Sequence, residues 1–487
     1  MIDPTALFSE KILNFSVHTS RHGARSYINL DSAATTPPLR IVENRVKSFL
    51  ETYGSVHRGA GTKSTLSTDI FEHSRRSIGK FIGADSNTYI LFTNNTTVGM
   101  NTLAHYFSQI QGKIAVSKIE HSSSWLPWIV AEGHRSAGNQ QRKISELATY
   151  NSLVQESGRK QVMRYGLNDQ SEFDLAAIEV ILRENQIKAL VLTASSNLTG
   201  YVPEIKSITS LARNYGAYVV VDGCQFIQHH PVNMKEMGID FLVASGHKFY
   251  APYGGGFIAG PKDFFDLFLP YQIGGGNLPY IDIAENFYTY SSERAHDPGT
   301  PNAVGAISMA AALEELEIIG ISNIETYERT LALRALNGLA KNPRVKVLAD
   351  ETRLTTVLPF IIQGINHNEV AARLNDEYGI GVRAGSFCVF DSIRALLGIE
   401  NDRDIVTELQ SGKFPEIPGI IRASFSIANT HDDVDAFVAA ITEIAEDGWT
   451  SASQEVTKTK TPDTLSRSYD YRESNQDGVC RSRGLIT

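Results

Sequence analysis

Cysteine is scarce in this chain of 487 residues, which contains only three. They stand far apart, at Cys224, Cys388 and Cys480. So few and so scattered cysteines cannot form the disulfide framework of a small secreted domain. They do not complete a spaced set of four zinc ligands either, so we expect no metal. A reducing compartment, the cytoplasm, is the expected location.

Long apolar runs are also missing. No stretch reaches the ~18 consecutive apolar residues that a membrane helix requires. The first residues include acidic side chains and do not show the basic and then apolar order of a secretory signal. We therefore expect no contact with a membrane.

The chain has no excess of positive charge. Lys and Arg number 45 and Asp and Glu number 54, which gives a net charge of −9. A nucleic-acid-binding protein normally carries a basic face, so we expect no nucleic-acid partner. Hydrophobic residues make up 42% of the chain, a value typical of globular proteins, and the length suits two or three domains.

Short apolar runs alternate with spans of helical spacing through the first 300 residues. The runs are rich in branched residues and lack strict polar alternation, which is typical of strands in a parallel sheet covered on both faces. This order predicts a doubly wound α/β domain. The expected strands are 89–92, 114–116, 189–192, 218–221 and 241–244, and 254–260 is expected to return beside them.

The rest of the chain has a different rhythm. A long alanine-rich helix over 304–316 leads to smaller elements and to a last helix over 431–446, which predicts a smaller C-terminal α/β domain. We expect a lead-in over 1–30, a large domain over 31–300 and a small domain over 301–448. Residues 449–487 are rich in Ser, Thr and charge, so we expect a disordered tail.

Polar residues of specific kinds follow three of the expected strands. Asp222 follows one strand, Lys248 follows the next, and Thr96 and Thr97 follow the first and open a helix. Ligands of open α/β sheets bind at the carboxyl ends of strands. This set suits pyridoxal 5′-phosphate (PLP), which needs a lysine for its attachment, an acidic partner for its pyridine nitrogen and an anion site for its phosphate.

The sequence resembles the class V aminotransferase-like PLP enzymes of fold type I, and within them the Suf-type cysteine desulfurases and selenocysteine lyases. The resemblance covers residues 28–447. The matching segments are LDSAAT (30–35), VHRG (56–59), FTNNTT (92–97), EH (120–121), SNLTG (196–200), VDGCQ (221–225), SGHKFYAPYGGG (245–256), PGTPN (298–302), RAGSFC (383–388) and RASF (422–425).

The resemblance implies roles for the residues at these matches. Lys248 would attach the cofactor and move protons at the substrate α-carbon, Asp222 would pair with the pyridine nitrogen, and Gln225 would contact the ring oxygen. His121 would stack on the ring. The residues expected to hold the phosphate are Thr96, Thr97, Ser245 and His247.

Three further matches concern the substrate and a partner. The resemblance implies that Asn197 and Arg422 bind the substrate carboxylate, Arg422 by the bidentate geometry that a guanidinium favours. Thr300 would reach the phosphate of the other subunit's cofactor, which implies a homodimer. Cys388 matches the cysteine that attacks the substrate sulfur from a flexible loop, and it must do so as a thiolate.

Three functions remain open at this point. The first is a cysteine desulfurase that converts L-cysteine to alanine and an enzyme persulfide, with a sulfur-acceptor protein as a partner. The second keeps PLP but is an aminotransferase, an epimerase or another carbon–sulfur lyase, and only the desulfurase needs the thiol of Cys388. The third is a non-enzymatic module, which the absence of a P-loop and of a well-placed G-x-G-x-x-G disfavours.

Overall fold

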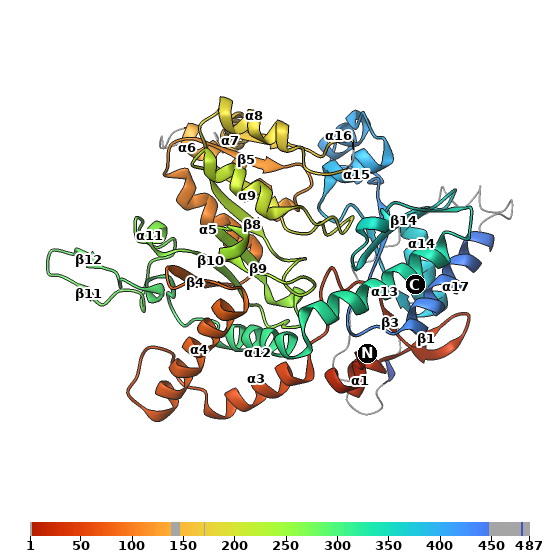
Figure 1. The fold of residues 1–487 in the computed structure, drawn as a ribbon, viewed down its shortest axis with the longest axis horizontal. Coiled ribbons are helices and arrows are strands. Elements are labelled where there is room, and N and C mark those ends of the chain that lie inside the picture. Colours follow the sequence, from red (N-terminus) through yellow and green to blue (C-terminus); the bar gives the residue numbers. More distant parts are fainter. Residues whose placement is uncertain (1, 138–146, 170, 448–478, 481–487) are drawn as a thin grey trace.

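A seven-stranded sheet forms the centre of the protein in a computed structural model that describes residues 2–137, 147–169, 171–447 and 479–480 (Figure 1). The strand order is β4-β10-β9-β8-β7-β5-β6. All strands run parallel except β10, which pairs antiparallel with β4 and β9. The strands are β4 (Thr88–Thr93), β5 (Lys113–Ser117), β6 (Val162–Tyr165), β7 (Ile187–Thr193), β8 (Tyr218–Asp222), β9 (Phe241–Ser245) and β10 (Gly256–Pro261).

Helices cover both faces of this sheet. Neighbouring side chains of β7 point to opposite sides: Leu190 joins one buried apolar cluster and Val191 joins another. The first cluster includes residues of α4 (Thr62–Phe81), α8 (Leu175–Glu184), α9 (Ile205–Asn214) and α12 (Ala303–Ile319). The second includes residues of α5 (Thr96–Ser108) and α6 (Ser122–Ala137). The predicted doubly wound fold is confirmed.

A smaller antiparallel sheet lies toward the C-terminus, in the order β13-β14-β17-β16. Its strands are β13 (Val345–Val347), β14 (Val357–Ile362), β16 (Arg383–Gly385) and β17 (Ile420–Ser424). One apolar cluster joins it to α13 (Ile321–Leu339), α14 (His367–Tyr378) and α17 (His431–Asp447). Two short helices, α15 (Phe390–Leu397) and α16 (Arg403–Gln410), lie between β16 and β17 along the chain.

The N-terminal segment packs against this C-terminal part. Strand β3 (Ile28–Asn29) pairs in parallel with β15 (Ile380–Gly381), and Leu30 belongs to the same buried cluster as the small sheet. The other N-terminal elements are α1 (Pro4–Leu7), α2 (Glu10–Leu13), β1 (Ser16–Thr19), β2 (Gly23–Ser26) and α3 (Arg40–Thr52). The predicted tail over 449–487 lies outside the described residues, apart from β18 (Val479–Cys480), which pairs with β1.

The sequence prediction located the five parallel strands and the returning strand β10, but it missed β6. That strand follows α7 (Leu147–Gln161) and pairs with β5 at the end of the sheet. The minor elements are α10 (Met234–Met237), α11 (Lys262–Phe265), β11 (Tyr280–Ile281) and β12 (Phe287–Tyr288). Within the described ranges, no helix is long and apolar enough to cross a membrane.

Candidate active site

Asp222 and Lys248 lie at the carboxyl ends of β8 and β9, which are neighbours in the sheet. The Asp222 carboxylate is buried and accepts hydrogen bonds from the Ser124 hydroxyl and, over 3.0 Å, from the Cys224 N–H. Burial lowers the pKa of Lys248 to about 8. Part of this amine is therefore neutral near neutral pH and can act as a nucleophile or accept a proton.

One backbone carbonyl, that of Ala33, holds two of the predicted cofactor residues. It accepts hydrogen bonds from Lys248 Nζ and, over 2.6 Å, from Gln225 Nε2. The other amide atom of Gln225, Oε1, is buried and has no partner among the described residues. An unpaired buried oxygen is costly, so this atom is suited to a hydrogen bond with a bound ligand.

The N-terminus of α5 carries the residues predicted to hold the phosphate. Asn95 caps this helix, and its side chain accepts from the Val98 N–H. Thr96 is buried, with its hydroxyl 2.7 Å from Cys224 Sγ. Thr97 is exposed and donates to the Ser123 hydroxyl over 2.8 Å. Free backbone N–H groups and hydroxyls at a helix start suit a phosphate.

Ser245 and His247 complete the end of β9. The Ser245 hydroxyl is buried and has no partner within the described part of the chain, so it can serve a ligand. Burial, together with the charge of Lys248, lowers the pKa of His247 to about 4. This imidazole is therefore neutral at physiological pH and can still donate a hydrogen bond.

Strand β10 separates β4 from β9, because it pairs with both. The strand that Thr96 follows is therefore not a direct neighbour of the strand that Lys248 follows. The contact between Thr96 and Cys224 nevertheless connects the start of α5 to the end of β8.

Asn197 and Arg422 lie in direct contact. Arg422 is only 2% exposed and donates to the Asn197 carbonyl over 2.8 Å and to the Asp31 carboxylate over 2.9 Å. Its Nε has no partner among the described residues. Burial lowers the pKa of Arg422, but a guanidinium stays charged at any ordinary pH. This cation can bind a carboxylate.

The start of α6 connects Cys388 to Asp222. Ser122 donates to the Cys388 carbonyl from its N–H over 2.8 Å and from its hydroxyl over 2.9 Å, while Ser124 donates to Asp222. The Cys388 thiol is free, and the residue is exposed. Cys388 belongs to a short turn, 386–389, and the buried residues Phe387 and Val389 anchor that turn on both sides.

His121 immediately precedes α6 and faces the same groups. Burial lowers its pKa, the charge of Asp222 opposes this shift, and the charge of Lys248 adds to it. Its Nδ1 accepts from the Ser123 N–H over 3.2 Å. The imidazole therefore lies close enough to Asp222 and Lys248 to interact with the charges of both.

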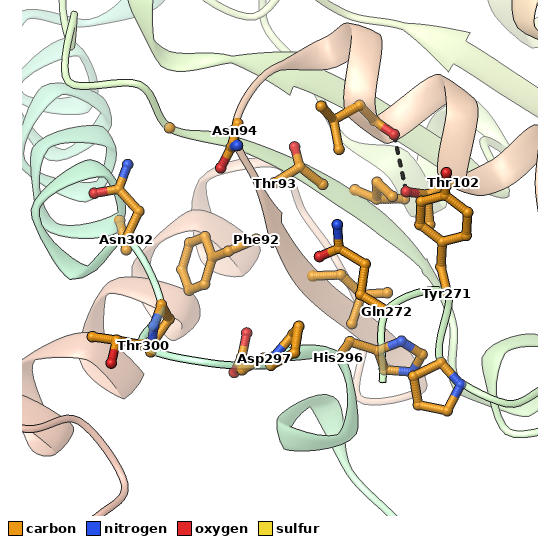
Figure 2. A pocket seen from close by; sticks show the side chains of 18 of the residues that line it. Phe92, Thr93, Asn94, Thr102, Tyr271, Gln272, His296, Asp297, Thr300 and Asn302 are labelled. Atoms are coloured by element: carbon orange, nitrogen blue, oxygen red, sulfur yellow. Dashed lines mark hydrogen bonds between the residues drawn. The ribbon is translucent and has the colours of Figure 1, made fainter. Parts of the chain in front are cut away.

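Thr300 lies elsewhere. It is exposed and lines a cavity of about 170 Å³ between the end of β4 and the segment before α12 (Figure 2). Asp297, Gln272 and Tyr271 line the same cavity. The structure does not bring Thr300 into the set around Lys248, and its predicted role toward a second subunit stays a prediction.

Sequence reasoning assigned no role to four residues of this site. Asp31 holds Arg422, Ala33 holds Lys248 and Gln225, and the hydroxyls of Ser122 and Ser124 hold Cys388 and Asp222. The LDSAAT match contains the first two. Ser122 and Ser124 follow the EH match closely and stand at the start of a helix. That position was the sequence feature that could have indicated their role.

Comparisons with known proteins found a matching family, related sequences and similar structures. The family described as aminotransferase class-V matches residues 28–437. The chain is 30% identical over 425 residues to the cysteine desulfurase CsdA of Escherichia coli K12, covering 86% of this chain and 94% of that protein. It is 29% identical to a probable cysteine desulfurase of Mycolicibacterium paratuberculosis, covering 89% of this chain and 58% of that protein.

The chain thus spans less than two thirds of the Mycolicibacterium relative. Among solved structures, a cysteine desulfurase of Thermococcus onnurineus NA1 aligns with a TM-score of 0.72 at 28% identity, covering 86% of this chain and 95% of that one. The E. coli CsdA structure aligns with a TM-score of 0.69 at 28% identity, also covering 86% and 95%.

Proposed function

This chain belongs to the class-V aminotransferase family, and on that premise we propose that it is a PLP-dependent cysteine desulfurase. The observation that carries the proposal is the start of α6, where Ser122 holds Cys388 and Ser124 holds Asp222. A free, exposed thiol thereby lies at the edge of a site that contains a lysine, a carboxylate and an anion-binding helix start. Several relatives are named cysteine desulfurases, which agrees with this assignment.

The residues present fit the cofactor. Asp222 would hold the pyridine nitrogen, Lys248 would attach the cofactor, and Gln225 Oε1 and Ser245 Oγ offer buried atoms without partners among the described residues. The start of α5, with Thr96 and Thr97, and His247 would hold the phosphate, and His121 would cover the ring. Bound PLP supplies an electron sink for the substrate α-carbon.

The protein's own residues then act on L-cysteine. Arg422 and Asn197 would orient its carboxylate, and Lys248, with a pKa of about 8, would move protons at the α-carbon and β-carbon. The Cys388 thiolate attacks the substrate sulfur: a sulfur–sulfur bond forms, the carbon–sulfur bond breaks, and the β-carbon takes up a proton. L-cysteine and the Cys388 thiol become L-alanine and a Cys388 persulfide.

A direct assay tests this function. Purified protein with L-cysteine and a reductant should release sulfide and alanine in equal amounts, and Lys248→Ala and Cys388→Ala should both abolish release. Turnover that persists in Cys388→Ala would indicate a carbon–sulfur lyase that needs no persulfide. Absence of turnover in a protein that binds PLP would favour an aminotransferase or an epimerase.

The proposal includes a homodimer. The hairpin of β11 and β12 projects from the body at the left of Figure 1. Its apolar side chains are exposed, with Ile283 at 101% and Tyr280 at 62%. Exposed apolar patches of this kind mark interaction sites. A second copy seated here would bury them beside the cavity lined by Thr300, so that Thr300 could reach the partner's phosphate site.

The proposal also includes a sulfur-acceptor protein as a partner and a cytoplasmic location. A persulfide on the exposed Cys388 must pass its sulfur to another thiol, which a partner protein can present at the surface. The cysteines Cys224 and Cys388 are both free, as a reducing compartment requires. Cell fractionation would test the location, and capture of a mixed disulfide through Cys388 would test the partner.

A further inference from the structure

Phe387, directly before Cys388, contacts both residues proposed to bind the substrate carboxylate. Its ring centroid lies 4.8 Å from the guanidinium carbon of Arg422. Its carbonyl oxygen accepts a hydrogen bond of 3.0 Å from Asn197 Nδ2. Phe387 is only 5% exposed. One residue therefore touches this pair with its side chain and with its backbone.

The turn that carries Cys388 has an unusual backbone. The Val389 N–H donates to the Ser386 carbonyl over 2.9 Å and closes a four-residue turn. Phe387 and Cys388 occupy its centre with φ angles of +52° and +59°. Turns with two positive φ angles normally take Gly or Asn, and a bulky residue is strained there. Such strain persists only where surrounding contacts hold it.

The contacts that hold this turn are specific. Phe387 and Val389 pack in one apolar cluster with Leu198, Ile393 and Ile420. A buried cation such as Arg422 favours an aromatic ring on its face. From the other side, Ser122 holds the Cys388 carbonyl. Cys388 itself is exposed, whereas Phe387 and Val389, on either side of it in the chain, are buried.

We propose that Phe387 is a positioning residue for the reaction: seated on Arg422 and Asn197, it fixes the Cys388 thiol relative to the bound carboxylate of the substrate. The inference rests on the proposed desulfurase function. Phe387 connects the Cys388 thiol to Arg422 and Asn197, the two residues that would orient the substrate. The distance from the thiol to the substrate carboxylate therefore depends on the position of the Phe387 side chain. Loss of the ring should free the thiol without removing the cofactor or the carboxylate site.

Four full-length proteins with PLP bound would test this. Phe387→Ala removes the ring, and Phe387→Tyr retains it. Phe390→Ala is the matched control, because Phe390 stands two residues after Cys388 and is 44% exposed. The fourth protein is the wild type.

Three readouts separate positioning from folding. The first is kcat and KM for alanine formation from L-cysteine. The second is exchange of the α-proton of L-alanine in D2O, which needs Lys248 and the carboxylate site but no thiol. The third is the mobility of a nitroxide on Cys388, recorded by electron paramagnetic resonance in a Cys480→Ser background, with the labelled position confirmed by peptide mass spectrometry.

We expect Phe387→Ala to lower kcat about tenfold or more with KM and α-proton exchange within about twofold, and to make the nitroxide more mobile. Phe387→Tyr and Phe390→Ala should stay within about twofold of the wild type in every readout. The inference is overturned if Phe387→Ala matches Phe390→Ala, or if α-proton exchange falls as much as alanine formation. If the wild type forms no alanine, the desulfurase proposal fails. Nitroxide mobility that is the same in Phe387→Ala and the wild type would, independently, overturn the proposal that Phe387 positions Cys388.

Discussion

Lys248 and Gln225 donate hydrogen bonds to the same acceptor, the backbone carbonyl of Ala33. Ala33 in turn donates from its N–H to the Ser424 hydroxyl over 2.9 Å. Two residues at the ends of sheet strands are thus oriented by a loop from the N-terminal segment, and that loop is fixed by the small sheet. The amine of Lys248 is therefore oriented by contacts that lead from the large sheet to the small one.

The lowered pKa of Lys248 predicts how cofactor attachment depends on pH. Burial favours the neutral amine, so its folded-state pKa is about 8, below the ordinary value of 10.5. Only the neutral amine attacks an aldehyde, so the rate at which cofactor-free protein takes up PLP should rise about tenfold per pH unit below 8 and level off above it. Stopped-flow absorbance from pH 6 to pH 10 would measure this. A rate that still rises at pH 10 would contradict the prediction.

The Ser124 hydroxyl should be important for PLP affinity. It donates to the buried Asp222 carboxylate, and a hydrogen bond to a charged group is worth about 1.5–3 kcal/mol. Ser124→Ala should therefore weaken PLP binding about tenfold or more, as measured by absorbance titration of cofactor-free protein. The control is Ser210→Ala, whose exposed hydroxyl donates to the Lys206 carbonyl of its own helix. Equal affinities in the two variants would refute this role.

Glu120 should make the protein less stable at alkaline pH. Burial raises its pKa to about 8, well above its ordinary value of 4.5. An acid with a raised folded-state pKa contributes stability that is complete below pH 4.5 and is lost as the pH rises through 8. Glu120→Gln removes this ionisation, so its free energy of unfolding should exceed that of the wild type by an amount that grows from pH 5 to pH 9. Urea unfolding at both values would measure the difference.

Asp297 and Arg75 form a buried ion pair that stabilises the segment before Thr300. Their charged atoms lie 2.6 Å apart, with side chains 2% and 5% exposed. Asp297→Ala removes the buried partner of the Arg75 charge, which keeps the partly exposed Glu72, and should cost about 3 kcal/mol of unfolding free energy. Asp297 also approaches His57 and Glu72, but Arg75 already donates to both carboxylates, so this group is an ion-pair cluster.

The control for Asp297 is an exposed pair on the same molecule. Lys80 and Glu317 lie 3.1 Å apart with side chains 74% and 50% exposed. Glu317→Ala should cost less than about 1 kcal/mol, because exposed ion pairs contribute little. If urea unfolding shows that Asp297→Ala and Glu317→Ala lose similar free energies of unfolding, burial does not make the Asp297–Arg75 pair more important than an exposed pair.

The exposed hairpin predicts a charge-sensitive interface. Ile283→Glu places a charge on the apolar surface between β11 and β12, so it should raise the dissociation constant of the proposed homodimer about tenfold or more in sedimentation experiments. Ile318, 78% exposed near the end of α12, provides the control variant Ile318→Glu, which should leave the dimer intact. A wild type that sediments as a monomer at every concentration would disprove the dimer.

Local sequence patterns predicted much of the fold and the ends of its strands. The branched apolar runs located β7, β8 and β9, because their burial on both faces leaves a recognisable composition. The pairing of β10 between β4 and β9 could not be read in this way, because it depends on contacts between distant segments. The same limit hid Asp31, which meets Arg422 across a sequence separation of 391 residues.

The Cys388 turn was also beyond the sequence. The resemblance implied a flexible loop, whereas the structure has a short turn with buried flanks. The aromatic contact of Phe387 with Arg422 depends on φ angles that nothing in the sequence signals, since neither central residue is Gly or Asn. Thr300 illustrates the reverse case: its motif was recognisable, but the role proposed for it needs a second copy of the chain.

The pairing of β3 with β15 has a consequence for the order of folding. Ile28 pairs with Ile380, so the partner of this N-terminal strand is synthesised hundreds of residues later. Closing so large a loop is entropically unfavourable until other structure has shortened it. The large sheet should therefore form first on the ribosome, while Ile28 and Leu30 remain exposed to solvent. Chaperones should bind this N-terminal segment of the nascent chain until residue 381 emerges.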